Sequence, residues 1–122
     1  MRTVAIIGAS NDRSKFGNKA VRGFTQKGFT VFPVNPIETV VEGLKAFPSV
    51  KDLPSRPEMV SVYVRPQVLL KLLPDIAAQG CDELWLNPGT ASDEVLAEAA
   101  RLRLNVIQAC SLIGIGVAPA AL

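Results

Sequence analysis

Residues 4–24, VAIIGASNDRSKFGNKAVRGF, contain an apolar run, a polar loop and a helix-like segment in succession. The apolar run that ends at Gly8 predicts a strand of a parallel sheet, buried on both faces. A polar loop follows, and apolar residues from Gly17 onward recur at helical spacing. The stretch therefore predicts a strand, a loop and a helix, an arrangement that often binds phosphate groups because the first amides of a helix are free to donate to an anion.

Strand-like and helix-like segments alternate along the remaining sequence. Ser92 is a predicted helix N-cap, Gly28 a helix stop, and Pro74 is expected to kink its helix or begin a new turn. This alternation predicts an α/β fold, a Rossmann-like, doubly wound, mainly parallel sheet of five or six strands with helices on both faces. The predicted strands are residues 3–8, 29–36, 58–64, 81–89 and 104–110, the helices 17–28, 67–80 and 91–103, with a short strand or turn in 40–50.

The length of 122 residues predicts one domain, residues 1–122, and an apolar content of 48% suffices for a buried core. No run of about 18 apolar residues predicts a membrane helix. The N-terminal apolar run fits a strand better than a signal peptide, so we expect a cytoplasmic protein that does not bind membranes. Cys81 and Cys110 lack the number and spacing of a disulfide framework and are predicted to be small buried residues.

The net charge is only +2, but residues 1–36 hold six basic residues and one acidic residue, whereas residues 37–122 are net acidic. The positive part includes the polar loop, which carries Arg13 and Lys15, so an anionic ligand is favoured there. Lys19, Arg22 and Lys27 equally fit the solvated side of a helix. Arg65 follows a predicted strand, and a guanidinium is suited to bidentate phosphate contacts.

The polar loop departs from the dinucleotide fingerprint G-x-G-x-x-G, whose three glycine positions are here Gly8, Ser10 and Arg13. The second strand ends in Asn35 rather than in the acidic residue that binds a nicotinamide-cofactor ribose. Both observations count against NAD, although NADP sites also lack the acid.

The motifs VAIIGAS, GFTVFPVNP, GLKAFPSVKDLP, VSVYVRP and LWLNPG occur in this order between residues 4 and 110. In this combination the chain resembles small bacterial coenzyme A (CoA)-binding proteins, which are similar to the N-terminal domain of the succinyl-CoA synthetase α subunit. Two features depart from that family: Asn87 stands where Gln is common, and Cys110 is followed by an apolar tail. The tail is expected to cover the sheet as a helix or strand, or else to serve as a docking or dimer segment.

The resemblance implies a CoA site at the carboxyl ends of the strands. It places the Gly8 turn and its loop at the CoA phosphates, the end of the second strand beside the adenosine, and two further turns on the opposite walls. The implied residues are Gly8, Ala9, Ser10, Arg13, Ser14 and Lys15 for the phosphates; Val34, Asn35 and Pro36 for the adenosine; and Tyr63, Val64, Arg65, Pro66, Asn87, Pro88 and Gly89 for the walls.

The chain contains no histidine. The synthetase that the family resembles works through a phosphorylated histidine, so that chemistry cannot occur here, and neither a Ser-His-Asp set nor a histidine metal site is possible. We therefore predict no catalytic residues and no metal. Trp85 and the five phenylalanines, at 16, 24, 29, 32 and 47, are predicted to lie in the core, and no basic stripe interleaves with them to bind nucleic acid.

These observations predict a non-catalytic protein that binds CoA or acyl-CoA as a small-molecule nucleotide ligand, acting as a carrier, a sensor or a partner of an acyl-CoA enzyme. One alternative is an NAD(P)-binding redox sensor or oxidoreductase-like domain. Another is a ligand-free interaction module, in which the tail would dock a partner or form a homodimer.

Overall fold

The computed structural model describes residues 2–122. Helices and strands alternate as the sequence pattern predicts. The elements are β1 (Thr3–Ile7), α1 (Phe16–Gln26), β2 (Thr30–Val34), β3 (Val40–Val41), β4 (Leu44–Lys45), η1 (Val50–Asp52), β5 (Met59–Val62), α2 (Pro66–Gln79), β6 (Glu83–Leu86), α3 (Asp93–Arg101), β7 (Val106–Gln108), α4 (Ser111–Gly114) and η2 (Pro119–Ala121).

Five strands form one sheet in the order β2-β1-β5-β6-β7, and every neighbouring pair is parallel. The strand β1 pairs on one side with β2 and on the other with β5, so Val4 lies between Val31 and Met59. From β1 the chain first adds β2 on one side and then adds β5, β6 and β7 on the other side. The order of the strands therefore switches between β1 and β5. In a doubly wound sheet this switch point opens a crevice at the carboxyl ends of the strands.

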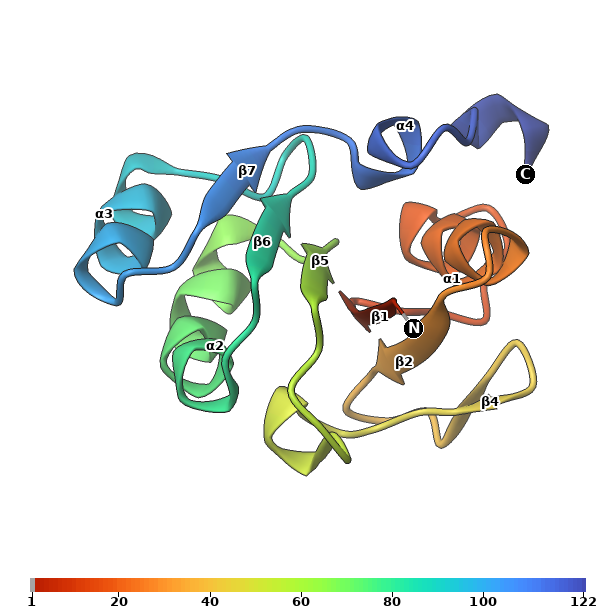
Figure 1. Cartoon of the computed structure of the whole chain (residues 1–122), viewed down its shortest axis with the longest axis horizontal. Coiled ribbons are helices and arrows are strands. Elements are labelled where there is room, and N and C mark those ends of the chain that lie inside the picture. Colours follow the sequence, from red (N-terminus) through yellow and green to blue (C-terminus); the bar gives the residue numbers. More distant parts are fainter. Residues whose placement is uncertain (1) are drawn as a thin grey trace.

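The helices cover both faces of the sheet, which confirms the predicted doubly wound fold (Figure 1). On one face α2 and α3 pack with η1 over a core that includes Leu69, Leu73 and Val95. On the other face α1 and α4 pack together, and the core there includes Phe24 of α1 and Leu112 of α4. The apolar residues that recur at helical spacing in each helix thus lie on the side that packs against the shared sheet.

A small hairpin of β3 and β4 follows β2. Glu42 and Gly43 form its two-residue turn, and both have positive φ angles, 49° and 78°. Two successive residues with positive φ are the mark of a type I′ turn, whose twist suits a two-residue hairpin. The predicted short strand or turn in residues 40–50 is therefore this hairpin.

The helix boundaries follow the predicted signals. Ser92 Oγ accepts a hydrogen bond from the Val95 amide at 3.1 Å, and Gly28 follows α1 with a φ of 84°. The helix α2 runs from Pro66 to Gln79 with Pro74 inside it, so Pro74 does not interrupt the helix. The expected kink at Pro74 stays a prediction. Pro74 lies on the exposed side of α2, while the buried Leu73 and Ile76 hold the helix against the sheet.

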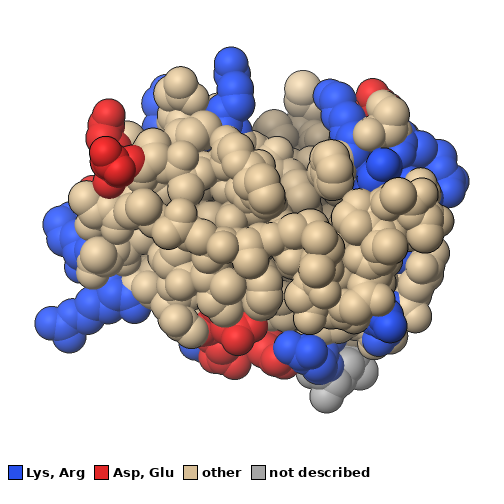
Figure 2. All heavy atoms as spheres, turned by 90° about the horizontal axis from the view of Figure 1, so that it is seen from above, with Lys and Arg blue, Asp and Glu red and all other residues tan. Residues whose placement is uncertain are grey.

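The tail covers the α1 face of the sheet, which was the expected alternative to a docking segment. Leu112 is fully buried, and a Cβ added to Gly23 of α1 would lie 2.5 Å from a Leu112 methyl carbon. Figure 2, seen from the side on which Figure 1 draws α4 and β7, shows uncharged residues across the middle of this face and charged ones around its edges.

One aromatic prediction is wrong: Phe16 is not a core residue but is 53% exposed, because it is the first residue of α1 and lies at the open end of the sheet. The other four phenylalanines and Trp85 are buried or partly buried in the two cores. Cys81 and Cys110 are partly rather than fully buried. Within residues 2–122 the helices are too short or too polar to cross a bilayer.

Candidate functional site

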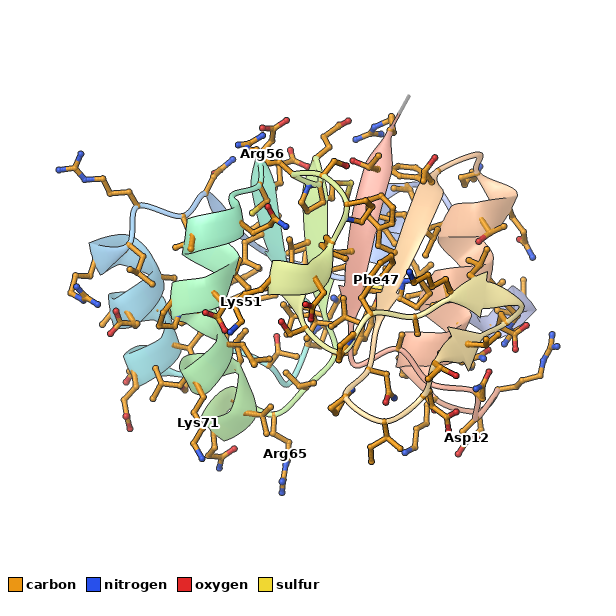
Figure 3. All side chains as sticks on the ribbon, turned by 90° about the horizontal axis from the view of Figure 1, so that it is seen from below. Asp12, Phe47, Lys51, Arg56, Arg65 and Lys71 are labelled. Atoms are coloured by element: carbon orange, nitrogen blue, oxygen red, sulfur yellow. The ribbon has the colours of Figure 1, made fainter. Side chains whose placement is uncertain are left out.

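A cavity of about 670 Å³ opens at the carboxyl ends of β1, β5 and β6, at the switch point of the sheet. Figure 3 shows Asp12, which follows β1, and Arg65, which follows β5, at the same edge of the molecule, with Arg56 at the opposite edge. The cavity is lined by Gly8, Lys15, Phe16, Gly17, Tyr63, Val64, Arg65, Asn87, Pro88, Gly89, Thr90, Cys110, Ile113 and Pro119.

The floor of the cavity is the turn at Gly8. Gly8 has a φ of +89°, and a Cβ there would lie 2.7 Å from the carbonyl oxygen of Tyr63. Only glycine adopts this backbone without strain and without a clash against the end of β5. The backbones of β1 and β5 therefore approach each other closely beneath the crevice.

The first turn of α1 forms one wall. Lys15 is the N-cap residue, and its side chain makes no capping hydrogen bond. The amides of Phe16 and Gly17 lie in the first turn, where a helix offers no acceptor of its own, so this wall presents backbone donors and a partial positive charge. The exposed Lys15 and Arg65, which line the cavity from two different elements, add two full positive charges.

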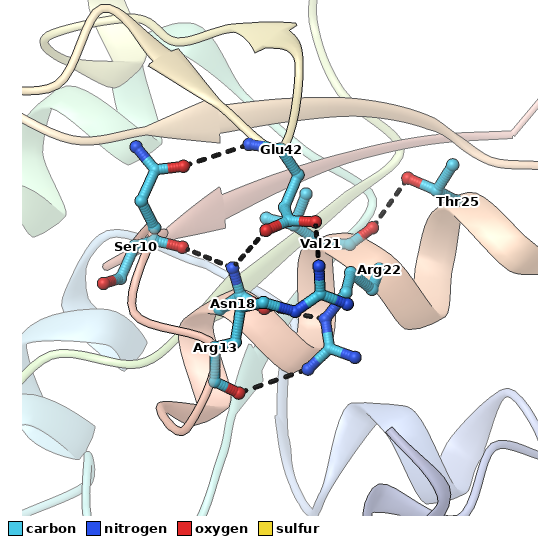
Figure 4. Close-up of polar contacts among 8 residues, drawn as sticks. Ser10, Arg13, Asn18, Val21, Arg22, Thr25 and Glu42 are labelled. Carbon is cyan, nitrogen blue, oxygen red and sulfur yellow. Dashed lines mark hydrogen bonds and ion pairs between the residues drawn. The ribbon is translucent and has the colours of Figure 1, made fainter.

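The loop between β1 and α1 is held by the β3–β4 hairpin (Figure 4). The buried Asn18 Nδ2 donates to the Ser10 carbonyl at 2.8 Å and to Glu42 Oε2 at 3.0 Å, and Asn18 Oδ1 accepts from Arg22 Nε at 2.7 Å. Arg13 forms an ion pair with Glu42 at 3.5 Å. Arg13 and Arg22 thus face a separate hollow of about 280 Å³ beside the hairpin, not the main cavity.

The loop hydroxyls are also used within the loop. Ser14 donates to Asp12 Oδ1 through its hydroxyl at 2.6 Å and its amide at 3.0 Å, and Ser10 Oγ accepts from the Asp12 amide at 3.0 Å. These donors from Ser14 hold the pKa of the Asp12 carboxyl below its ordinary value. Ser10 and Ser14 therefore shape the loop and do not line the cavity.

Asn35 at the end of β2 positions the Gly8 turn. Its Nδ2 donates to the Ala9 carbonyl at 2.9 Å, and its Oδ1 accepts from the amides of Ile37 and Glu38 at 2.7 and 2.8 Å. Both ends of this side chain are thus engaged inside the protein. Neither Asn35 nor its neighbours Val34 and Pro36 line the cavity.

A buried polar cluster closes the other end of the cavity. Asn87 Nδ2 donates to Ser61 Oγ at 2.9 Å and to the Val62 carbonyl at 2.8 Å, while its Oδ1 accepts from the Ser111 amide at 2.9 Å. The Ser111 hydroxyl lies 2.8 Å from Ser61 Oγ and 3.0 Å from the Tyr63 hydroxyl. Burial raises the pKa of Tyr63, which stays a neutral hydrogen-bonding phenol. The cluster fixes α4 against β5 and β6.

The structure brings together only part of the predicted set. The predicted residues that line the cavity are Gly8, Lys15, Tyr63, Val64, Arg65, Asn87, Pro88 and Gly89. Those that do not are Ala9, Ser10, Arg13, Ser14, Val34, Asn35, Pro36 and Pro66.

Sequence reasoning missed six cavity residues: Phe16, Gly17, Thr90, Cys110, Ile113 and Pro119. It also missed the roles of Ser61 and Ser111. The available signal was a single serine inside each of two largely apolar segments, MVSVYV and ACSLIG. Among the side chains of residues 2–122, no three or more Cys, Asp or Glu gather in a way that would hold a metal ion.

An all-parallel doubly wound sheet with a glycine turn, a helix N-terminus and two cations around its switch-point crevice defines a Rossmann-like domain whose crevice suits an anionic ligand. Residues 2–115 match the family described as the CoA binding domain, and the chain belongs to this family.

Two named relatives are much longer than this chain, and the chain matches only a part of each. The chain is 34% identical over 80 residues to the α subunit of ADP-forming acetate–CoA ligase II from Pyrococcus furiosus, a match that covers 65% of this chain and 18% of that subunit. It is 32% identical over 81 residues to the corresponding ligase of Archaeoglobus fulgidus, covering 65% of this chain and 12% of the ligase. The matched region is thus less than a fifth of either protein.

Solved structures of similar size share the fold over nearly the whole chain. A conserved hypothetical protein from Pyrococcus furiosus superimposes with a TM-score of 0.86 at 31% identity, covering 93% of this chain and 99% of that one. A hypothetical protein from Pyrococcus horikoshii gives a TM-score of 0.85 at 27% identity, covering 90% and 78%. The domain therefore also occurs as a small protein of about this length.

Proposed function

We propose that this chain binds CoA in the crevice between β1 and β5 and catalyses no reaction on it. The observation that carries the proposal is the switch-point cavity, which joins the first turn of α1, Lys15 and Arg65 in a chain of the CoA binding domain family. CoA carries a pyrophosphate and a 3′-phosphate, so its binding needs several cationic or amide donors. The α1 amides, Lys15 and Arg65 supply donors of both kinds.

The nicotinamide-nucleotide alternative is less well supported, and Asn35 is the reason. Its position corresponds to the ribose-binding acid of dinucleotide sites, yet its side chain is engaged with Ala9, Ile37 and Glu38. A ribose hydroxyl at this position would have to replace one of these internal hydrogen bonds.

The ligand-free alternative is weakened by the cavity itself. Gly8 and Arg65 line it, although Ser10 and Asn35 do not. A chain that had kept only the fold would have no need of two cations, Lys15 and Arg65, at the mouth of an open crevice. The turn and the cations are together what a bound nucleotide requires.

The proposed role is that of a CoA carrier or sensor in the cytoplasm that works with a separate acyl-CoA enzyme. The ADP-forming ligase relatives support this role, since in them a region similar to this chain is part of a larger acyl-CoA-forming enzyme. The homodimer suggested by the sequence stays a prediction.

Calorimetric titration with CoA, 3′-dephospho-CoA and NAD tests the proposal. We expect micromolar binding of CoA, weaker binding of the dephospho form and still weaker binding of NAD. Tighter binding of NAD than of CoA would favour the nicotinamide alternative. Binding of none of the three would refute the proposed function and leave the interaction module.

A further inference from the structure

The strand β7 lies at one end of the sheet, and within residues 2–122 β6 is the one strand that pairs with it (Figure 1). The outer edge of β7 therefore presents backbone groups to no other strand. Residues 104–112, LNVIQACSL, contain neither a charged residue nor a proline. Natural proteins commonly block a free edge with such residues, because an open edge pairs with a further strand. The edge at β7 carries no block of this kind.

The opposite edge of the same sheet is blocked. The edge strand β2 contains Pro33, which has no amide to donate to a further strand. The Pro33 carbonyl accepts a hydrogen bond from the Phe47 amide at 2.9 Å, and the Asn35 amide donates to the Phe47 carbonyl at 3.0 Å. The segment after the hairpin thus covers the end of β2. Of these two edges, that of β7 is the one open to a further strand.

The register of β7 with β6 shows which of its backbone groups face outward. The Leu84 amide donates to the Asn105 carbonyl at 2.8 Å, so the backbone of Asn105 faces β6. Successive residues of a strand present their backbone groups to opposite sides. The amides and carbonyls of Val106 and Gln108 therefore face outward, whereas those of Ile107 face β6.

Ile107 is a half-buried apolar side chain at this edge. It is directly opposite Trp85 in the β6–β7 ladder, so the two side chains lie on one face of the sheet. That face is the one that α4 covers, since a Cβ on Gly114 would lie 2.8 Å from the Trp85 ring. Trp85 packs against the core on this face, whereas Ile107 is not among the residues of either core. An added strand would bury the remaining surface of Ile107.

We propose that β7 pairs with β7 of a second copy of this chain, antiparallel and about a two-fold axis between the two Ile107 residues. In this register Val106 of each copy lies opposite Gln108 of the other, and each donates to and accepts from its opposite residue. The two Ile107 side chains meet as a non-hydrogen-bonded pair, the closer kind of cross-strand pair. The interface uses the sheet edge rather than the tail, and it does not depend on the proposed function.

The charges of α3 favour a second copy as the partner. The helix α3 lies at the same end of the molecule as β7 (Figure 1), and it has Asp93 and Glu94 in its first turn and Arg101 in its last. The proposed axis places both α3 helices on one side of the joined sheet and makes them antiparallel. The acidic start of each helix then faces the basic end of the other across the axis, which is a complementary arrangement of charge.

The oligomeric state in solution tests this interface. Light scattering after gel filtration should give twice the monomer mass for the intact chain at high micromolar concentration. We expect Ile107→Lys to weaken the dimer by roughly tenfold or more, because it replaces a buried apolar pair by two like charges. Ala109→Lys is the matched control, since Ala109 is exposed at the same edge. The two Ala109 residues would be about 14 Å apart, beyond the screening length at physiological salt, so this variant should dimerise like the wild type.

A disulfide tests the register. In a background with Cys81→Ala and Cys110→Ala, Ile107→Cys should oxidise to a covalent dimer, because the proposed pair brings the two Cβ atoms close enough for a disulfide. Ala109→Cys in the same background should stay monomeric on a non-reducing denaturing gel, because its two copies are too far apart.

Each contrary outcome overturns a defined part of the proposal. A monomer at every concentration would overturn the dimer itself. A dimer as stable in Ile107→Lys as in Ala109→Lys would overturn its placement at β7. Cross-linking of Ala109→Cys as fast as that of Ile107→Cys would overturn the register. Circular dichroism verifies folding, and if Ile107→Lys does not fold, the two cysteine variants decide the placement.

Discussion

Gly17, in the first turn of α1, packs directly on Gly8 at the end of β1. A Cβ added to Gly17 would overlap the Gly8 carbonyl oxygen and lie 2.9 Å from its carbon. In the dinucleotide fingerprint the third glycine allows this close approach of helix to strand. Here Gly17 does so after a longer loop, which explains how a chain without the fingerprint spacing keeps the helix N-terminus at the crevice.

Gly17→Ala is therefore predicted to destabilise the protein by about 3 kcal/mol, the upper end of the usual cost of overpacking, because the contact is with rigid backbone. Urea unfolding measures the change. Gly28→Ala is the control, since Gly28 has a φ of +84° and open space around its missing Cβ. That variant should lose only about 1 kcal/mol through backbone strain. Equal losses in the two variants would contradict the packing argument.

Asn87→Ala is predicted to lower the free energy of unfolding by about 2–4 kcal/mol, because it leaves the Ser111 amide and the Val62 carbonyl buried without their partner. The single tryptophan, Trp85, reports on α4, since a Cβ on Gly114 would lie 2.8 Å from its ring. We expect a red shift of its fluorescence in the variant.

Thr90→Val is the matched control for Asn87→Ala. Thr90 is also buried, and its hydroxyl donates one hydrogen bond, at 2.7 Å, to the Asn87 carbonyl. Its replacement should cost about 1 kcal/mol and leave the fluorescence unchanged. If the two variants behaved alike, Asn87 would not be the residue that fixes α4.

Lys15→Ala and Arg65→Ala are each predicted to weaken CoA binding by about 1–3 kcal/mol, the scale of a hydrogen bond to a charged group. Arg13→Ala removes a cation from the same loop, but Arg13 is paired with Glu42 outside the cavity. Its effect on CoA affinity should be smaller than that of Lys15→Ala. Calorimetry decides between them, and a larger effect of Arg13→Ala would move the phosphate site toward the hairpin.

Cys81 is predicted to be an unreactive thiol at pH 8. Burial raises its pKa to about 11 from an ordinary value of 9.0, so almost no thiolate forms in the folded state. Mass spectrometry after iodoacetamide treatment should show slow labelling of Cys81 in the folded protein and fast labelling in urea. Equal rates would contradict the assigned burial.

The same pKa gives the direction of a pH effect on stability. Above pH 9 the unfolded chain loses the Cys81 proton while the folded chain keeps it, so the free energy of unfolding falls as the pH rises toward 11. Below pH 9 this contribution is fully present. Cys81→Ala should therefore show a shallower loss of stability between pH 9 and 11 in urea unfolding, and an unchanged slope would contradict the assignment.

The sequence predicts the fold well, because each strand has a local signal of its own. The apolar runs before Gly8 and Arg65, the Ser92 cap and the Gly28 stop are all read within a few residues and agree with the structure. Because strands and helices alternate, the sheet is parallel, and its crevice is expected at the carboxyl ends of the strands. Fold class and the general location of the cavity follow from these local features.

The detailed lining of the cavity could not be predicted, because it depends on contacts between residues far apart in the chain. Arg13 is separated from Glu42 by 29 positions, and Ser111 from Asn87 by 24. Whether a loop cation faces the cavity depends on such a partner, which local patterns do not reveal. Phe16 was misassigned because apolar spacing does not show that a helix begins at an open edge.

The most direct test of CoA binding at the switch point is a titration of ¹⁵N-labelled protein with CoA, followed by NMR. The proposal predicts that the largest amide shift changes fall on Gly8, Phe16, Gly17 and Gly89, which line the cavity. Changes confined to Arg13, Arg22 and Glu42 would place the ligand in the hollow beside the hairpin. Those changes, or none at all, would contradict CoA binding at the switch point.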